Sequence, residues 1–209
     1  MKRAGLFAAI ALAVAAIGIA AVPARAADIV AEWANVKPPP PPALEPVTAD
    51  PKTTALLMLD FLPYCSKNPR CVASLPAMKK LLAAARASST TVIYSLAGKF
   101  GPSDIVKDVA PLGSEPAVKS HSDKFIDTDL EKILKDKGIQ TVIVDGTAAN
   151  GAVLYTGSDA ALRGFKVIIP VDGLSAPDLY AEQITVWQLA HIPAVGGQVT
   201  LTRSDMIKF

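Results

Sequence analysis

The chain has 209 residues with 21 basic and 19 acidic side chains, and 51% of its residues are hydrophobic. The first 26 residues hold Lys2, Arg3 and Arg25 and no acid, so the 183 residues that follow carry 18 basic and 19 acidic side chains. Such a balanced chain lacks the basic surface that nucleic acid requires, so we expect no nucleic-acid partner. Its length suits one domain with a full hydrophobic core.

The first 26 residues have the pattern of a secretory signal peptide. Lys2 and Arg3 precede a long run of Ala, Ile, Leu and Val, and Ala24 and Ala26 are the small residues that signal peptidase requires before its cut. We therefore expect cleavage after Ala26 and a periplasmic or secreted protein. Because the apolar run is long, the alternative is an uncleaved segment that tethers the protein to a membrane.

Residues 27–53 form a proline-rich leader. Five consecutive prolines at 38–42, followed by Pro46 and Pro51, favour extended polyproline II structure and exclude a helix. Two interpretations stay open. The leader is either a spacer that separates the domain from a membrane or a partner, or a stiff segment that lies on the domain surface.

Strand and helix patterns alternate over residues 54–209. The first strand is an unbroken apolar run that ends in Asp60, which is typical of a buried parallel strand. The alternation predicts an α/β domain with three αβα layers and a mainly parallel six-stranded, Rossmann-like sheet. Strands are expected at 54–60, 90–95, 115–119, 141–145, 166–170 and 199–202, and helices at 72–88, 127–137, 150–163 and 177–191.

Ligands of parallel sheets bind beyond the carboxyl ends of the strands. Asp60 ends the first expected strand, Lys119 ends the third, and the turn 146–152 joins the fourth strand to a helix. An acid and a lysine beside a helix N-terminus can hold an anion or move a proton, although such acids also cap turns, the role we expect for Asp145. We expect this turn to bind a small-molecule ligand or substrate through Thr147, Ala148, Ala149, Asn150 and Gly151.

Three segments carry a family pattern: ALLMLDF at 55–61, residues 119–164, and KVIIPVDGLSA at 166–176. Lys119 lies six residues before Phe125, Thr-Asp-Leu follows, and the later turn continues with Thr-x-x-Asp-Ala at 156–160. Together these segments resemble the isochorismatase-like hydrolases, or cysteine hydrolase superfamily, which includes nicotinamidases and carbamoylsarcosine amidase-like enzymes. Lys124 is an alternative lysine, but the spacing to Phe125 favours Lys119.

The resemblance implies a catalytic triad of Asp, Lys and Cys. Asp60 matches the Asp that deprotonates the thiol, and Lys119 matches the Lys that supports the charge. The Cys position is occupied by Ala152, whose methyl group cannot attack a carbonyl, so the thioester route is closed. The metal site of nicotinamidases needs a nearby Asp-x-His, which neither His121 nor His191 supplies, so we expect no metal and no other cofactor.

Three explanations of Ala152 stay open. In the first, the protein is a hydrolase without a thiol, as isochorismatases proper are, and Asp60 with Lys119 performs acid–base chemistry on a small carboxylate, amide or vinyl ether. In the second, the protein is an inactive family member that serves as a periplasmic binding or scaffold protein. In the third, the nucleophile has moved to Cys65 or to the hydroxyl of Thr147 or Tyr155.

The chain has two cysteines, Cys65 and Cys71. In an exported protein we expect them to form a disulfide, which would hold a short loop rather than stabilise the whole fold. Free thiols would instead leave Cys65 as a candidate nucleophile. The resemblance also implies a homo-oligomer, because members of the family often assemble.

Overall fold

The computed structural model describes residues 28–209, which divide into a short unit ending at Pro40 and a larger unit, Pro41–Phe209. The expected signal peptide, and with it the alternative membrane tether, lies outside the described residues. Over 28–209, no helix combines the length and the apolar character needed to cross a membrane. The short unit contains a single 3-10 turn, Trp33–Asn35, and its apolar side chains are exposed.

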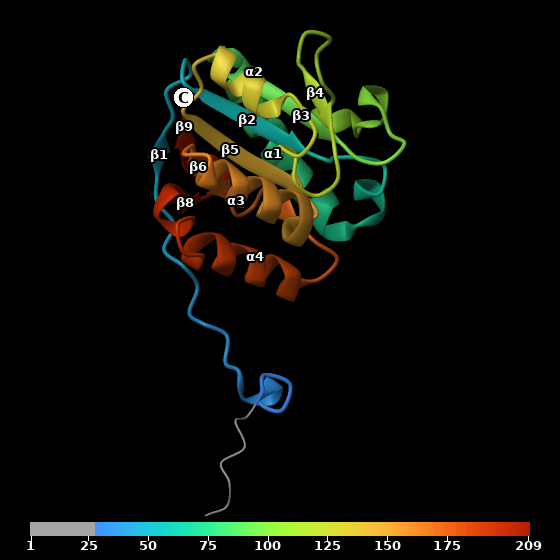
Figure 1. Ribbon diagram of the computed structural model, residues 1–209. Helices are drawn as coiled ribbons and strands as arrows, with labels where there is room; N and C mark the ends of the chain where they lie inside the picture. The colour runs from blue at the N-terminus through green and yellow to red at the C-terminus, as the bar shows by residue number, and fades with distance from the viewer. Residues whose placement is uncertain (1–27) are drawn as a thin grey trace, which may run out of the picture. The chain divides into compact units, whose positions relative to one another are not determined.

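A mainly parallel sheet forms the centre of the larger unit (Figure 1). A short strand, β7 (Leu174–Ser175), pairs with the end of β5 and adds a seventh strand to the six that the sequence predicts. The α/β prediction is therefore confirmed. In spatial order the other strands are β4 (Ala117–Lys119), β3 (Thr91–Leu96), β2 (Thr54–Leu59), β5 (Thr141–Thr147), β6 (Lys166–Pro170) and β8 (Val199–Thr202).

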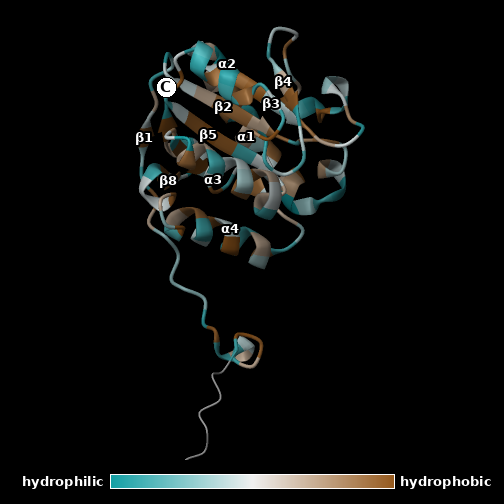
Figure 2. Ribbon diagram, viewed as in Figure 1, coloured by the Kyte–Doolittle hydropathy of each residue, from teal (hydrophilic) through white to brown (hydrophobic). Residues whose placement is uncertain are grey.

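Helices cover both faces of the sheet, which gives the three expected layers. On one face lies α1 (Pro69–Ala87), and on the other lie α2 (Leu130–Asp136), α3 (Leu154–Leu162) and α4 (Leu179–His191). Side chains alternate along each strand, so Leu56 of β2 packs on the α1 side and Leu57 on the other. Figure 2 shows β2 and β5 in the hydrophobic colours between these layers. Burial on both faces explains the unbroken apolar run in the sequence.

The second half of the proline-rich leader belongs to the larger unit. The Glu45 N–H donates to the Leu201 carbonyl at 2.9 Å. Just after it, β1 (Val47–Thr48) pairs with β9 (Ile207–Lys208) at the other end of the chain. Residues 45–48 therefore lie on the domain surface, as in the second of the two interpretations of the leader.

The carboxyl ends of β2 and β5 approach each other closely. Leu59 is the register partner of Gly146, and a Cβ atom at Gly146 would lie 2.1 Å from the Leu59 carbonyl oxygen. Gly146 also has a φ of +134°, which side chains rarely permit. Only glycine fits here, and it allows Asp60 and the turn after β5 to begin on neighbouring strands at one edge of the sheet.

Candidate active site

Asp60 is the first residue beyond β2, and its backbone is left-handed, with a φ of 51°. Aspartate tolerates this conformation better than most residues. The Ser95 hydroxyl at the end of β3 donates to Asp60 Oδ1 at 2.6 Å, and Ser95 Oγ accepts the Asp60 N–H at 3.2 Å. The two strand ends are thus joined by a reciprocal pair of bonds, which fixes one carboxylate oxygen.

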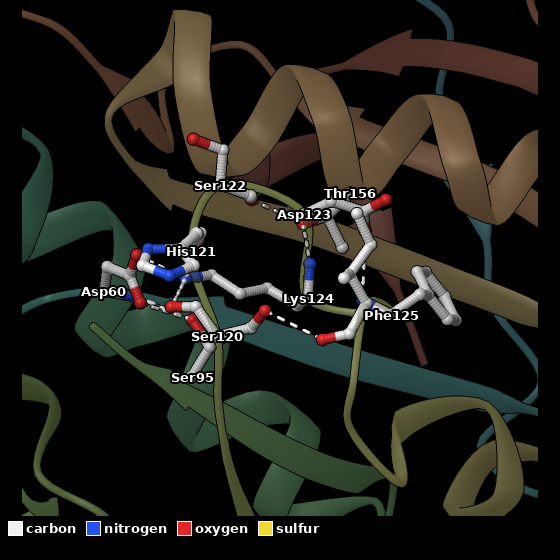
Figure 3. A network of polar contacts seen from close by, with 10 residues as sticks. Asp60, Ser95, Ser120, His121, Ser122, Asp123, Lys124, Phe125 and Thr156 are labelled. Atoms are coloured by element: carbon white, nitrogen blue, oxygen red, sulfur yellow. Dashed lines mark hydrogen bonds and ion pairs between the residues drawn. The ribbon is translucent and has the colours of Figure 1, made fainter. Parts of the chain in front are cut away.

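Lys124 forms an ion pair with the other carboxylate oxygen of Asp60. Its Nζ lies 2.7 Å from Asp60 Oδ2, and it also donates to the carbonyls of His121, at 2.5 Å, and Ser120, at 3.4 Å. Figure 3 shows the lysine stem running from its loop to the carboxylate. The Lys124 side chain is 0% exposed and that of Asp60 is 6% exposed. The three ammonium hydrogens therefore all have acceptors, and the ion pair is buried with a small opening on the acid.

The structure corrects the expectation that Lys119 supports Asp60. Lys119 is the last residue of β4, whose side chains alternate so that Val118 is buried and Lys119 is exposed. The loop after β4 runs on to α2 at Leu130, and within it Phe125 is buried and stacks on Phe165 at 6.2 Å. Lys124 and Phe125 are consecutive residues of a bend, and both are buried: the Phe125 ring packs into the core, and the Lys124 ammonium reaches Asp60.

The pKa of the Tyr64 phenol is raised well above the ordinary value by its burial, and further by its closeness to the Asp60 carboxylate. The hydroxyl therefore stays protonated at neutral pH and can donate a hydrogen bond. The Tyr64 ring meets Phe100 edge to face at 6.2 Å, and 40% of Tyr64 remains exposed.

The turn after β5 carries the position of the missing thiol. A cis peptide bond joins Thr147 to Ala148, and one π-helical turn, Ala149–Val153, leads into α3. Ala152 is buried among apolar residues that include Leu59, the residue before Asp60. Ala152 therefore lies within the turn in which the resemblance places a nucleophile.

The residues expected to bind a ligand differ in their exposure. Ala149 is buried, Asn150 is exposed, and Ala148 and Gly151 are half-buried. The Thr147 hydroxyl donates to the Ser175 carbonyl at 3.2 Å. A Cβ atom at Gly151 would lie in ordinary contact, at 3.8 Å, with Ala148 Cβ and, at 3.9 Å, with Ser122 Oγ. The loop that carries Lys124 therefore reaches the start of this turn.

Cys65 and Cys71 form a disulfide, as the sequence predicts, and both are fully buried. Neither cysteine of the chain is left as a free thiol. The disulfide removes Cys65 as a relocated nucleophile, and the bond to Ser175 occupies the Thr147 hydroxyl. The Tyr155 side chain is 55% exposed on α3. Within the described part of the chain, no cluster of three or more His, Cys, Asp or Glu side chains could hold a metal ion.

Asp145 lies within β5, before the turn, and its side chain is buried in the interior. It is fully buried on the α1 side of β5, where a Cβ atom at Gly173 would lie 3.0 Å from its own Cβ. Among residues 28–209, neither of its carboxyl oxygens has a hydrogen-bond partner, so the expected bonds to turn N–H groups are not formed. Burial raises the pKa of Asp145 well above its usual range, and the charge of Asp172 adds to that effect.

Sequence reasoning proposed Asp60 and the turn as the site, gave Ser95 no role beyond its place at a strand end, and ranked Lys124 second. Ser95 could have been found from its place, because it ends the strand expected beside that of Asp60. Spacing could not identify Lys124, because the family pattern has its lysine six residues before the Phe, and Lys119 has that spacing to Phe125.

A family profile describing the isochorismatase domain matches residues 54–204. The secreted isochorismatase effector Isc1 of Verticillium dahliae is 26% identical over 176 residues, which cover 76% of this chain and 93% of that protein. YaaI, an isochorismatase family protein of Bacillus subtilis, is 30% identical over 74 residues, 35% of this chain, and the match spans only 41% of YaaI. The crystal structure of N-carbamoylsarcosine amidase from Thermoplasma acidophilum has the same fold, with a TM-score of 0.64 at 21% identity over 73% of this chain and 97% of that one.

Proposed function

Because the chain belongs to the isochorismatase domain family, we propose that it is an exported hydrolase that works without a thiol, through acid–base chemistry of Asp60 and Lys124. The observation that carries this proposal is the buried ion pair between them, with 2.7 Å between Nζ and Oδ2. A buried ion pair contributes little to stability by itself, so its presence at a strand end favours a functional role.

The chemistry follows from the charge state of the pair. Paired with an ammonium, Asp60 is a carboxylate, which accepts a proton. A water molecule in contact with it would transfer a proton to Asp60 while its oxygen attacks the carbonyl carbon of a small amide. The carbon–nitrogen bond then breaks and the proton passes from Asp60 to the leaving nitrogen, which yields an acid and an amine. The backbone N–H groups at the start of the Ala149–Val153 turn would hold the transient oxyanion.

A vinyl ether demands the opposite step, because its hydrolysis begins with a proton given to carbon. Asp60 would have to be protonated first, at the expense of its ion pair with Lys124. Among the substrate classes expected from the sequence, the geometry therefore favours amides, including those with a carboxylate, over vinyl ethers.

Export of the protein is part of the proposal. The Cys65–Cys71 disulfide is typical of proteins from oxidising compartments, and the similar Verticillium protein is a secreted one. The N-terminal signal pattern agrees with both. If the protein is exported, its small-molecule substrate must be present in the periplasm or outside the cell.

One observation favours a second candidate, a binding protein that retains the pocket of an enzyme. Both oxygens of Asp60 already accept hydrogen bonds, and the three hydrogens of the Lys124 ammonium all have acceptors. A carboxylate whose two oxygens are both engaged has fewer lone pairs left to accept a proton from a water molecule. In this alternative, Ala152 marks the loss of catalysis and the turn holds a small carboxylate.

The deciding experiment is a turnover screen of the exported chain against panels of small amides, carbamoyl compounds and vinyl ethers, followed by mass spectrometry. Asp60→Asn is tested in parallel, with Lys119→Met as a control that removes an exposed charge. We expect an amide that the wild type and Lys119→Met consume and Asp60→Asn spares. If no compound is consumed and a small molecule instead co-purifies with the protein, the hydrolase proposal fails in favour of the binding protein.

A further inference from the structure

The helix that follows the Ala152 turn also contacts the loop that carries Lys124. Thr156, in the first turn of α3, is fully buried. Its Oγ1 accepts the Lys124 N–H at 3.2 Å and donates to the Ser122 carbonyl at 3.4 Å, as Figure 3 shows. One hydroxyl thus uses its donor and its acceptor on a segment more than 30 positions away in the sequence.

The two threonines in the α-helices of residues 28–209 use their hydroxyls differently. A buried threonine in a helix commonly bonds the carbonyl four residues earlier, as Thr185 of α4 does with Ala181 at 2.7 Å. Thr156 instead directs its hydroxyl away from its own helix and to the loop. The Thr156 hydroxyl therefore makes its hydrogen bonds to the loop and not to a carbonyl of its own helix.

Two later residues on the same face of α3, Asp159 and Arg163, also lie near the loop that carries Lys124. Burial raises the pKa of the Asp123 carboxyl and the charge of Asp159 raises it further, and the Arg163 guanidinium lies over the Phe125 ring, 4.9 Å from its centre. Thr156, Asp159 and Arg163 have the three- and four-residue spacing of one helix face. The helix therefore contacts the backbone of Lys124 and the ring of Phe125, the residue that follows it.

Holding the backbone matters because lysine has a long and flexible stem. The Lys124 ammonium reaches Asp60 only if its Cα atom starts from the right place. Ala152 lies about one helical turn before Thr156, and the Ala149–Val153 turn continues directly into α3. The nucleophile position and the residue that bonds the Lys124 backbone therefore belong to one continuous helical segment, which fixes their separation.

We propose that Thr156 is a positioning residue, whose hydroxyl fixes the Lys124 backbone to α3 and so sets the reach of the ammonium to Asp60. This inference rests on the proposed function of the ion pair. Valine keeps the shape of threonine and removes the hydroxyl, whereas serine keeps the hydroxyl, so the two variants separate packing from hydrogen bonding.

The first test is hydrogen–deuterium exchange of the amides in residues 120–126, followed by mass spectrometry. In Thr156→Val we expect exchange there to be about 3- to 10-fold faster, the factor that one buried hydrogen bond contributes, and in Thr156→Ser we expect it to stay near wild type. Thr185→Val is the matched control, because it removes a buried helical hydroxyl that does not contact this loop. Unchanged exchange in Thr156→Val would overturn the proposal.

The second test reads the charge at the site without any substrate. In an Ala152→Cys background, the rate of iodoacetamide labelling is measured against pH, because the thiolate is the reacting form. Lys124→Met should move this profile to higher pH, since the ammonium favours the thiolate, and Thr156→Val should move it in the same direction while Thr156→Ser should not. A shift with Lys124→Met but none with Thr156→Val refutes the positioning role alone. No shift with Lys124→Met contradicts the proposed function, and the exchange experiment still decides the role of Thr156.

Discussion

Exchanging Lys124 for methionine would remove one partner of the buried ion pair and keep a side chain of similar length. The Lys124 side chain is 0% exposed and that of Asp60 is 6% exposed, so water cannot replace the lost ammonium. Removing one partner of such a pair costs about 3–5 kcal/mol of unfolding free energy. For a domain of this size, that loss lowers the melting temperature by roughly 6–20 °C.

Lys119→Met is the matched comparison, because it makes the same chemical change five positions earlier. Lys119 is exposed and has no ion pair in the described structure, so we expect a change within about 0.5 kcal/mol. Urea and thermal unfolding of both variants, with the disulfide intact, would measure the difference. Equal losses, or a larger loss with Lys119→Met, would refute the assignment of the lysine.

A double-mutant cycle tests whether the cost belongs to the pair. Asp60→Asn removes the charge that Lys124→Met leaves unpaired, so the double variant should lose less stability than the two single losses added together. Additive losses would show that Lys124 stabilises the loop through its carbonyl contacts and not through Asp60.

Three further predictions concern other residues. Because burial raises the pKa of Asp145, the folded state holds its proton more tightly than the unfolded state, and stability is lost as the pH rises from the ordinary value of 3.8 toward the folded pKa. Asp145→Asn should therefore gain stability relative to wild type as the pH rises above about 4, and parallel unfolding curves for the two proteins would contradict this reasoning. The thiol of Ala152→Cys should react with iodoacetamide faster than an ordinary surface cysteine, and slow labelling would mean that the site is closed to small molecules. The intact mass of the unreduced protein should be lower than that of the reduced protein by two hydrogens, and alkylation of Cys65 and Cys71 without reductant would disprove the disulfide.

The sequence by itself determined the layers of this protein and pointed to the edge of the sheet where the candidate site lies. Strands buried on both faces must be apolar throughout, so 54–59 could be recognised without coordinates. The acid that ends this strand, Asp60, is also evident in the sequence. The absence of a thiol at Ala152 is likewise a fact of the sequence, and the closeness of Cys65 to Cys71 along the chain made their disulfide predictable.

Only the tertiary structure decided which lysine pairs with Asp60. Lys119 and Lys124 are five residues apart, and spacing along the chain favoured the wrong one. The outcome depends on contacts between distant segments: β4 places Lys119 on an exposed face, Phe125 packs against Phe165, and Thr156 holds the Lys124 backbone. A lysine stem is long and flexible, so the carboxylate that it reaches is set by where the folded loop places its backbone.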